Sequence, residues 1–172
     1  MELSSVHNQI IEPITQEAIK ALKDMAHSNA WAGAEFQDSV WKFRFNGFAI
    51  VAEVSGMLNG TVVFHHYLET AMALGKRLLN FRKGSINEGV GLTDEMQAAL
   101  LDYADEVVAH ASKELKKTGM QVDFKSSFPV LSMHHVSDLL INVDEIHSIP
   151  LHVDTVGRHY LNFFIKDHNG MN

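Results

Sequence analysis

The fold is decided by the stretch GFAIVAEVSGMLNGTVVFHHYLETAMALGKRLLN, which spans Gly47–Asn80. Two runs rich in Val, Ile and Phe predict strands over Gly47–Ser55 and Thr61–His65, and Gly56–Gly60 between them predicts the turn of a β-hairpin. Apolar residues then recur at helical spacing over Tyr67–Leu79, which predicts a helix. A hairpin followed at once by a helix is typical of an antiparallel sheet with helices packed on a face.

On the N-terminal side of this stretch the sequence predicts a helix, a loop and a further strand. Apolar residues repeat at helical spacing over Asn8–His27. Pro13 is tolerated only in a first turn, so the regular helix should begin near Glu12. The small, polar residues of Ser28–Ser39 predict a loop, and the Val, Trp and Phe of Val40–Phe45 predict a strand.

On the C-terminal side, Gly84–Gly91 predicts a loop that leads into a second long helix. Thr93 can serve as the N-cap of this helix, with Met96 at the third helical position. The helical pattern continues to Lys117, and Thr118-Gly119 is a typical helix end. This helix carries the residues on which the functional prediction rests.

The remaining sequence predicts strands in succession. Met120–Lys125 alternates as a half-buried strand does, Pro129–Met133 can continue it, and Leu139–Glu145 and Ile149–Asp154 suit short strands. Val156–Lys166 is the most strongly apolar and should form a closing strand. With no long linker in the chain, we expect a single α+β domain over residues 1–172. It should contain an antiparallel-rich β-sheet with long helices packed on it.

Composition excludes several classes of function. The 172 residues carry 21 acidic and 14 basic side chains, a net charge of −7, without the dense basic patch that nucleic acid requires. There is no cysteine, so thiolate catalysis, thiolate metal sites and disulfides are excluded. We find no signal-peptide pattern and no apolar run long enough to span a membrane, so we expect a soluble, cytoplasmic protein.

The histidines do not form a recognisable metal or catalytic motif. There are 11, including the doublets His65-His66 and His134-His135. Adjacent residues point apart on a strand or helix, and the spacings match no zinc pattern, so we expect no metal. Histidines that are at the surface or partly satisfied are the simpler interpretation. An unrelated enzyme that uses the histidines, with or without a metal ion, is a remoter alternative.

The second long helix carries three acidic residues beside its apolar stripe: Asp102, Asp105 and Glu106, followed by Ala109. Helical spacing places them on an adjacent or opposite face to the stripe. Pattern alone favours a solvated acidic face without function. One helix offers its carboxylates to only one side of an ion, which argues against a metal site here.

Several segments, in this order along the chain, together resemble the CheX/CheC family of chemotaxis phosphatases, CheX more closely. The segments are Glu12–Met25, Gly47–Asn80, LTDEMQAALLDYADEVVAHASKEL (Leu92–Leu115), VDFKSSFPVL (Val122–Leu131) and SIPLHVDTVGRHYLNFFI (Ser148–Ile165). The resemblance implies the CheC-like fold over most of the chain.

The resemblance also implies a function. In the family, a helix Glu anchors a lysine of phosphorylated CheY, and an Asn three residues later orients the attacking water. By position, Asp102 and Asp105 would be the catalytic pair, and Asp102, Glu106 and Ala109 would contact the partner. The partner would be a CheY-type response regulator, which supplies its own Mg²⁺, so no cofactor of the chain's own is expected. A homodimer is also implied, with the apolar terminal strands as a shared sheet edge.

This chain departs from the family's site in ways that have chemical consequences. Asp102 keeps the charge of the family's Glu but is one methylene shorter. Asp105 replaces an amide, which donates and accepts, by a carboxylate that only accepts and that would lie beside an anionic phosphoryl group. Ala109-His110 replaces a Gly-Asn pair, and Ala98 stands where an acid is expected. Two hypotheses follow: a CheX-like phosphatase, or a catalytically lapsed relative that binds a response regulator or acts as a scaffold.

Overall fold

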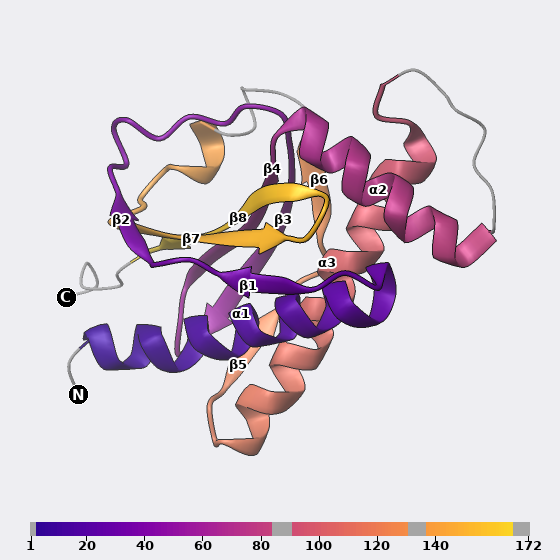
Figure 1. The fold of residues 1–172 in the computed structure, drawn as a ribbon. Helices are drawn as coiled ribbons and strands as arrows, with labels where there is room; N and C mark the ends of the chain where they lie inside the picture. The colour runs from indigo at the N-terminus through magenta and orange to yellow at the C-terminus, as the bar shows by residue number, and fades with distance from the viewer. Residues whose placement is uncertain (1–2, 84–90, 131–136, 167–172) are drawn as a thin grey trace.

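The computed structural model describes residues 3–83, 91–130 and 137–166, which form one sheet with helices against it (Figure 1). The helices are α1 (Leu3–Ala26), α2 (Leu68–Lys83) and α3 (Asp94–Lys117). The strands are β1 (Ala30–Ala32), β2 (Phe36–Asp38), β3 (Phe48–Gly56), β4 (Gly60–His66), β5 (Val122–Phe124), β6 (Phe128–Val130), β7 (Glu145–Val153) and β8 (Gly157–Ile165). The predicted α+β class is therefore confirmed.

The sheet is antiparallel in every pairing that the described strands make, in the order β1-β7-β8-β4-β3-β5. Two short strands lie off this path, β2 paired with β7 and β6 paired with β3. The predicted hairpin is β3–β4, with Phe48 opposite His66 and Val54 opposite Gly60. Strand β3 ends at Gly56, which has φ +107° and where any Cβ would collide with the Gln121 carbonyl oxygen.

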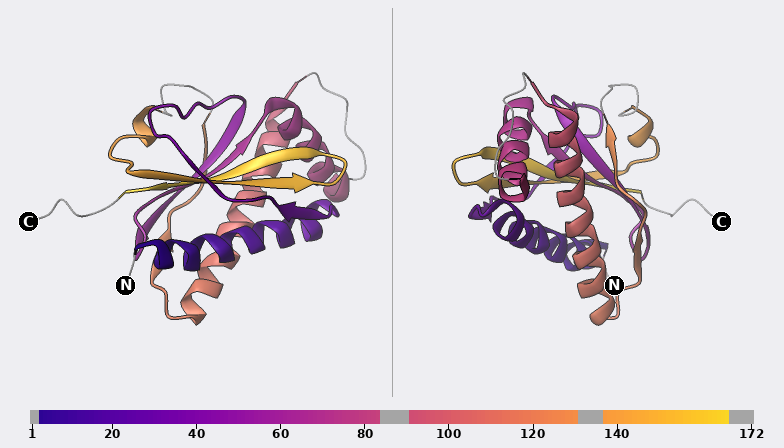
Figure 2. Two further views of the ribbon diagram at one scale, coloured as in Figure 1. Left: turned by 60° about the vertical axis from the view of Figure 1, so that its left-hand side comes forward. Right: turned by 90° about the vertical axis from the view of Figure 1, so that its right-hand side faces the viewer.

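The two faces of the sheet are covered differently. Alternate residues of β4, such as Val62 and Phe64, lie in the main core with buried residues of all three helices, which pack on one face (Figure 2). The intervening Val63 lies in a smaller apolar cluster on the other face, together with Phe43 and Phe164. That face has no long helix among the described residues, and the segment between β2 and β3 crosses it instead.

The first helix is longer than predicted. It begins at Leu3, and Pro13 lies inside it rather than in its first turn. Pro13 has no N–H to offer the carbonyl of residue 9, a loss that tertiary packing outweighs here. Ile10, Ile11 and Ile14 around it are buried in the main core, which explains why the helix continues.

One predicted loop and two predicted strands need correction. The expected loop Ser28–Ser39 contains β1 and β2, which are too short to leave a sequence pattern and depend on pairing with β7. Val40–Phe45 is not a strand: the backbone turns at residues 40–42, and Phe43 N–H donates to the Ser39 carbonyl. The expected strand Leu139–Glu145 is also wrong. Residues 137–142 form a helical turn and a reverse turn, and strand β7 begins only at Glu145.

The terminal strands do not form the sheet edge that a dimer was expected to share. β8 lies between β4 and β7, and β7 is covered on its other side by β1 and β2. The edges are the short strands β1, β2, β5 and β6, so the prediction of a shared terminal edge was wrong. The homodimer itself stays a prediction. Two predictions fall on residues outside the described part of the chain. They are the loop Gly84–Gly91, apart from Gly91 itself, and residues 131–133 of the expected strand Pro129–Met133.

Candidate functional site

Helix α3 is held by a core stripe and by caps at both ends. Its buried side chains include Leu100, Tyr103, Val107 and Ala111, which pack into the main core. At the N-terminus, the Thr93 hydroxyl accepts a hydrogen bond from Met96 N–H at 3.3 Å, as predicted. Residues Thr118-Gly119 end the helix, and Gly119 has the positive φ of +81° that suits glycine there. The polar face of α3 is therefore fixed in orientation.

The structure brings the predicted site residues together on this polar face. Asp102, Asp105, Glu106 and Ala109 are all exposed. Residues three or four positions apart lie within one helical turn of each other, with Cβ atoms about 5–6 Å apart. Asp102 and Asp105 are thus exposed carboxylates on neighbouring positions of the same helix face. Their catalytic and binding roles stay predictions.

Glu106 also belongs to a network of polar side chains between two helices. Its carboxylate lies 3.2 Å from Nε2 of His110, whose Nδ1 lies 3.5 Å from Glu17 on α1. Lys20 extends the network at 3.8 Å from Glu17. Sequence analysis treated His110 only as a departure from the family. The four-residue spacing of Glu106 and His110 was the available signal.

Behind the acidic face lie two buried histidines. His159 is partly satisfied, as expected of the histidines, but His66 is neither at the surface nor hydrogen-bonded to a described residue. His66 of β4 and His159 of β8 are opposite each other in the sheet and fully buried, with rings stacked 4.5 Å apart between centroids. The hydroxyl of Tyr103 on α3 lies 3.4 Å from Nε2 of His159.

Burial holds both rings neutral. It lowers the pKa of His159 to about 3 and places the pKa of His66 well below its ordinary value, the second ring adding to the effect on His66. Both nitrogens of His66 and Nδ1 of His159 lack hydrogen-bond partners among the described residues. No group of three or more metal-ligating side chains occurs within the described part of the chain, so this pair is not completed into a metal site there.

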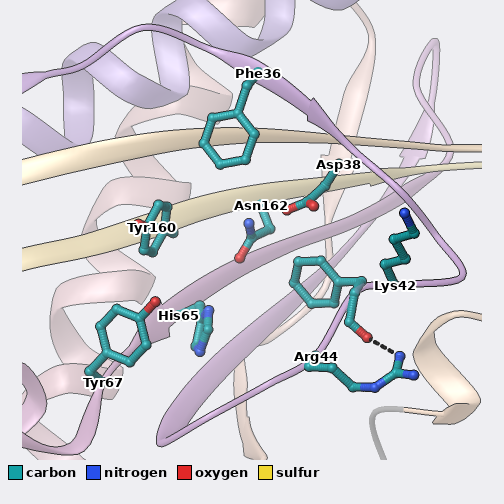
Figure 3. Close-up of a pocket in the computed structure, with 9 residues that line it drawn as sticks. Phe36, Asp38, Lys42, Arg44, His65, Tyr67, Tyr160 and Asn162 are labelled. Atoms are coloured by element: carbon teal, nitrogen blue, oxygen red, sulfur yellow. Dashed lines mark hydrogen bonds between the residues drawn. The ribbon is translucent and has the colours of Figure 1, made fainter.

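A second candidate site lies on the face without long helices. Residues from β2, β4, β8 and the segment after β2 enclose a cavity of about 280 Å³ (Figure 3). Its lining consists of aromatic, charged and amide side chains: Phe36, Asp38, Lys42, Phe43, Arg44, His65, Tyr67, Tyr160 and Asn162. This site was not predicted from the sequence because it is built from separate segments of the chain. The alternation that points His65, Tyr160 and Asn162 to one face was the only signal.

Comparison with known proteins shows the fold. No family model and no curated protein matches the chain. A CheC-like superfamily protein from Shewanella sp. PV-4 superposes with a TM-score of 0.71 at 14% identity, covering 97% of this chain and 100% of that one. CheX from Desulfovibrio desulfuricans gives 0.70 at 14% identity, covering 91% and 99%.

CheX from Borrelia burgdorferi, solved as a complex with CheY, BeF3 and Mg²⁺, gives a TM-score of 0.70 at 18% identity and covers 91% of this chain and 97% of that one. The chain therefore has an α+β fold of the CheC-like type. Within that type, the predicted likeness to the CheX chemotaxis proteins is confirmed as a likeness of fold. Among the described residues, no helix is both long and apolar enough to cross a membrane.

Proposed function

We propose that this chain binds a phosphorylated CheY-type response regulator on the acidic face of α3 and accelerates loss of its phosphoryl group. One observation carries the proposal. Asp102 and Asp105 are exposed one helical turn apart, on a rigid helix of a CheX-like fold. The complex of Borrelia burgdorferi CheX with CheY supports a receiver domain as the partner.

The proposed chemistry divides between the two carboxylates. Asp102 pairs with a cation of the docked regulator and sets the register between the proteins. Asp105 accepts a proton of the water that attacks phosphorus, while the regulator's aspartyl carboxylate leaves and inorganic phosphate forms. The Mg²⁺ would belong to the regulator. This division asks the chain for positioning rather than for covalent chemistry.

A second candidate is a domain that binds a response regulator without turnover. The observation that favours it is the charge at the site: Asp102, Asp105 and Glu106 are all exposed carboxylates. Negative charge beside an anionic phosphoryl group opposes the stabilisation that its transfer needs. Glu106 lies 3.2 Å from Nε2 of His110, so its charge is the one that a neighbouring side chain of α3 can offset.

Phosphate release from a CheY-type regulator of the same organism, charged with acetyl phosphate and Mg²⁺, tests the proposal. The wild-type chain should accelerate release over the regulator alone, and Asp105→Ala should abolish the acceleration. Asp105→Asn should increase it, because the amide removes the charge and restores a donor. Asp24→Asn, an exposed aspartate on α1, is the matched control and should behave as wild type.

Calorimetric binding of the same regulator separates the two candidates. Binding with no acceleration by the wild type, together with a gain in Asp105→Asn, would support the non-catalytic domain. Absence of both binding and acceleration in the wild type and in Asp105→Asn would exclude both candidates.

A further inference from the structure

The cavity on the face without long helices has walls that are fixed by packing. Phe43 is buried, and its ring packs edge-on against Phe45 and Phe164 at 5.0 and 5.1 Å between centroids. Phe36 on β2 packs edge-on at 6.4 Å from Tyr160 on β8. These contacts tie the segment after β2 to the sheet. The cavity is thus preformed, as small-molecule sites usually are, and its volume suits a small ligand.

The floor of the cavity contains an unsatisfied acceptor. Asn162 is 2% exposed, and its Nδ2 donates to the Ser148 hydroxyl at 2.7 Å, which in turn donates to Asp38 at 3.2 Å. This chain of bonds fixes the orientation of the amide. Its Oδ1 has no hydrogen-bond partner among the described residues. A buried acceptor without a partner is unfavourable, so Asn162 is poised to accept from a ligand.

The surroundings of that oxygen suit a positively charged donor. In Figure 3 the amide oxygen lies on the side of His65 and Tyr67, with Tyr160 nearby. His65, Tyr67 and Tyr160 are mutual neighbours, with ring centroids 5.6 to 6.2 Å apart. Burial lowers the pKa of His65, so its ring is neutral. Tyrosine faces attract cations, as the guanidinium of Arg158 5.3 Å from the centroid of Tyr160 shows, and Asp38 adds a negative charge to the cavity.

The opposite end of the cavity is basic. Lys42 and Arg44 line it and come from the segment that crosses the face (Figure 3). Nη1 of Arg44 donates to the carbonyls of Trp41 and Phe43, which fixes the guanidinium beside the cavity. Lys42 forms no ion pair within 4.0 Å in the described part of the chain, although Asp38 lines the same cavity. One end therefore offers an acceptor and aromatic faces, and the other offers cations.

We propose that this cavity binds a free amino acid with an aromatic side chain. The ammonium group donates to Oδ1 of Asn162, the carboxylate accepts from Lys42, and the side chain packs against Phe36 and Phe43. This assignment does not depend on the proposed function of α3, because the cavity lies on the opposite face of the sheet.

Calorimetry with three related compounds tests the proposal. L-Phenylalanine has the ammonium, carboxylate and ring; 3-phenylpropionate lacks the ammonium, and phenethylamine lacks the carboxylate. We expect L-phenylalanine to bind and each of the other two to bind about tenfold more weakly or worse. In nuclear magnetic resonance titrations, the side-chain amide signal of Asn162 should shift with L-phenylalanine.

Lys42→Gln tests the basic end without touching the core, because Lys42 is exposed. It should weaken L-phenylalanine binding about tenfold and leave phenethylamine binding unchanged. Lys113→Gln, at an exposed position on α3, is the matched control and should leave both unchanged.

Three outcomes would overturn the proposal: equal binding of all three compounds, no binding of any, or binding that Lys42→Gln and Lys113→Gln change alike.

Discussion

At the scale of single residues, the proposed chemistry of α3 is limited by the Asp105 carboxylate, which has no hydrogen to donate. A carboxylate at this position can accept a water proton but cannot hold the water by donating to it, as an amide does. Its exposure keeps it solvated, so it carries its negative charge to any docked partner. The carboxylate of Asp105, which stands where the CheX family has an amide, can act as a base but also repels a phosphoryl group.

Asp102 should contribute to docking rather than to turnover. Asp102→Ala should weaken binding of a CheY-type regulator, by about three- to tenfold, because an exposed ion pair contributes about 1 kcal/mol. The loss should shrink as salt is raised, since salt screens exposed charges. Calorimetry at two ionic strengths measures both effects. Binding that is unaffected by Asp102→Ala would place the interface elsewhere.

The buried histidines make the fold sensitive to acid. The ordinary pKa of histidine is 6.5, whereas that of folded His159 is about 3. Below pH 6.5 the unfolded chain therefore binds protons that the folded chain does not. Each pH unit between 6.5 and about 3 should lower the free energy of unfolding by about 1.4 kcal/mol through His159, and the lowered pKa of His66 acts in the same direction. Above pH 6.5 these two groups add no pH dependence.

Urea unfolding at several pH values between 7.5 and 4.5 measures this loss. His159→Gln should reduce the slope of unfolding free energy against pH by about one proton. His27→Gln, at an exposed position, is the control and should keep the wild-type slope. An unchanged slope in His159→Gln would show that His159 is protonated in the folded chain.

At the scale of elements, the N-cap of α3 should carry a measurable share of stability. Thr93→Ala removes the acceptor of the Met96 N–H and should lower the free energy of unfolding by about 1 kcal/mol. Thr93→Ser retains the hydroxyl and should lose little. Urea denaturation of the three proteins compares them. Equal loss in both variants would attribute the effect to packing of the threonine methyl group instead.

Sequence predicted the elements whose signals are local. The hairpin β3–β4 and the helix α2 were predicted because Gly47–Asn80 contains strand composition, a glycine-bounded turn and helical spacing in succession. Helix α3 was predicted with its cap. By contrast, β1 and β2 form only because the long strand β7 provides their partners. Phe43 belongs to the smaller apolar cluster, where it anchors the segment between β2 and β3, and it is not part of a strand. Such tertiary causes leave no periodic pattern.

The candidate sites divide in the same way. Asp102 and Asp105 lie on one helix, so their spacing alone placed them together. The pair His66 and His159, and the cavity around Asn162, join positions about a hundred residues apart through the pairing of β4 with β8. Their proximity depends on strand register, which one sequence does not reveal.

At the scale of the whole molecule, the assembly state depends on short edges. The strands at the ends of the sheet have only three residues each, and β1 and β2 expose Trp31 and Phe36. The predicted homodimer would have to use such an edge or a surface outside the sheet. Light scattering coupled to size exclusion should give twice the mass of 19.2 kDa. A constant monomer mass over a wide concentration range would contradict the prediction.

The central position of β8 has a consequence for synthesis on the ribosome. Strands β4 and β7 are joined only through β8, which is the last of the described strands to be translated. Until residue 165 leaves the exit tunnel, the β3–β4 hairpin exposes one apolar strand without a partner, and β7 cannot join the sheet. The nascent chain should therefore fold late and cooperatively, and ribosome stalling before β8 would leave an aggregation-prone intermediate.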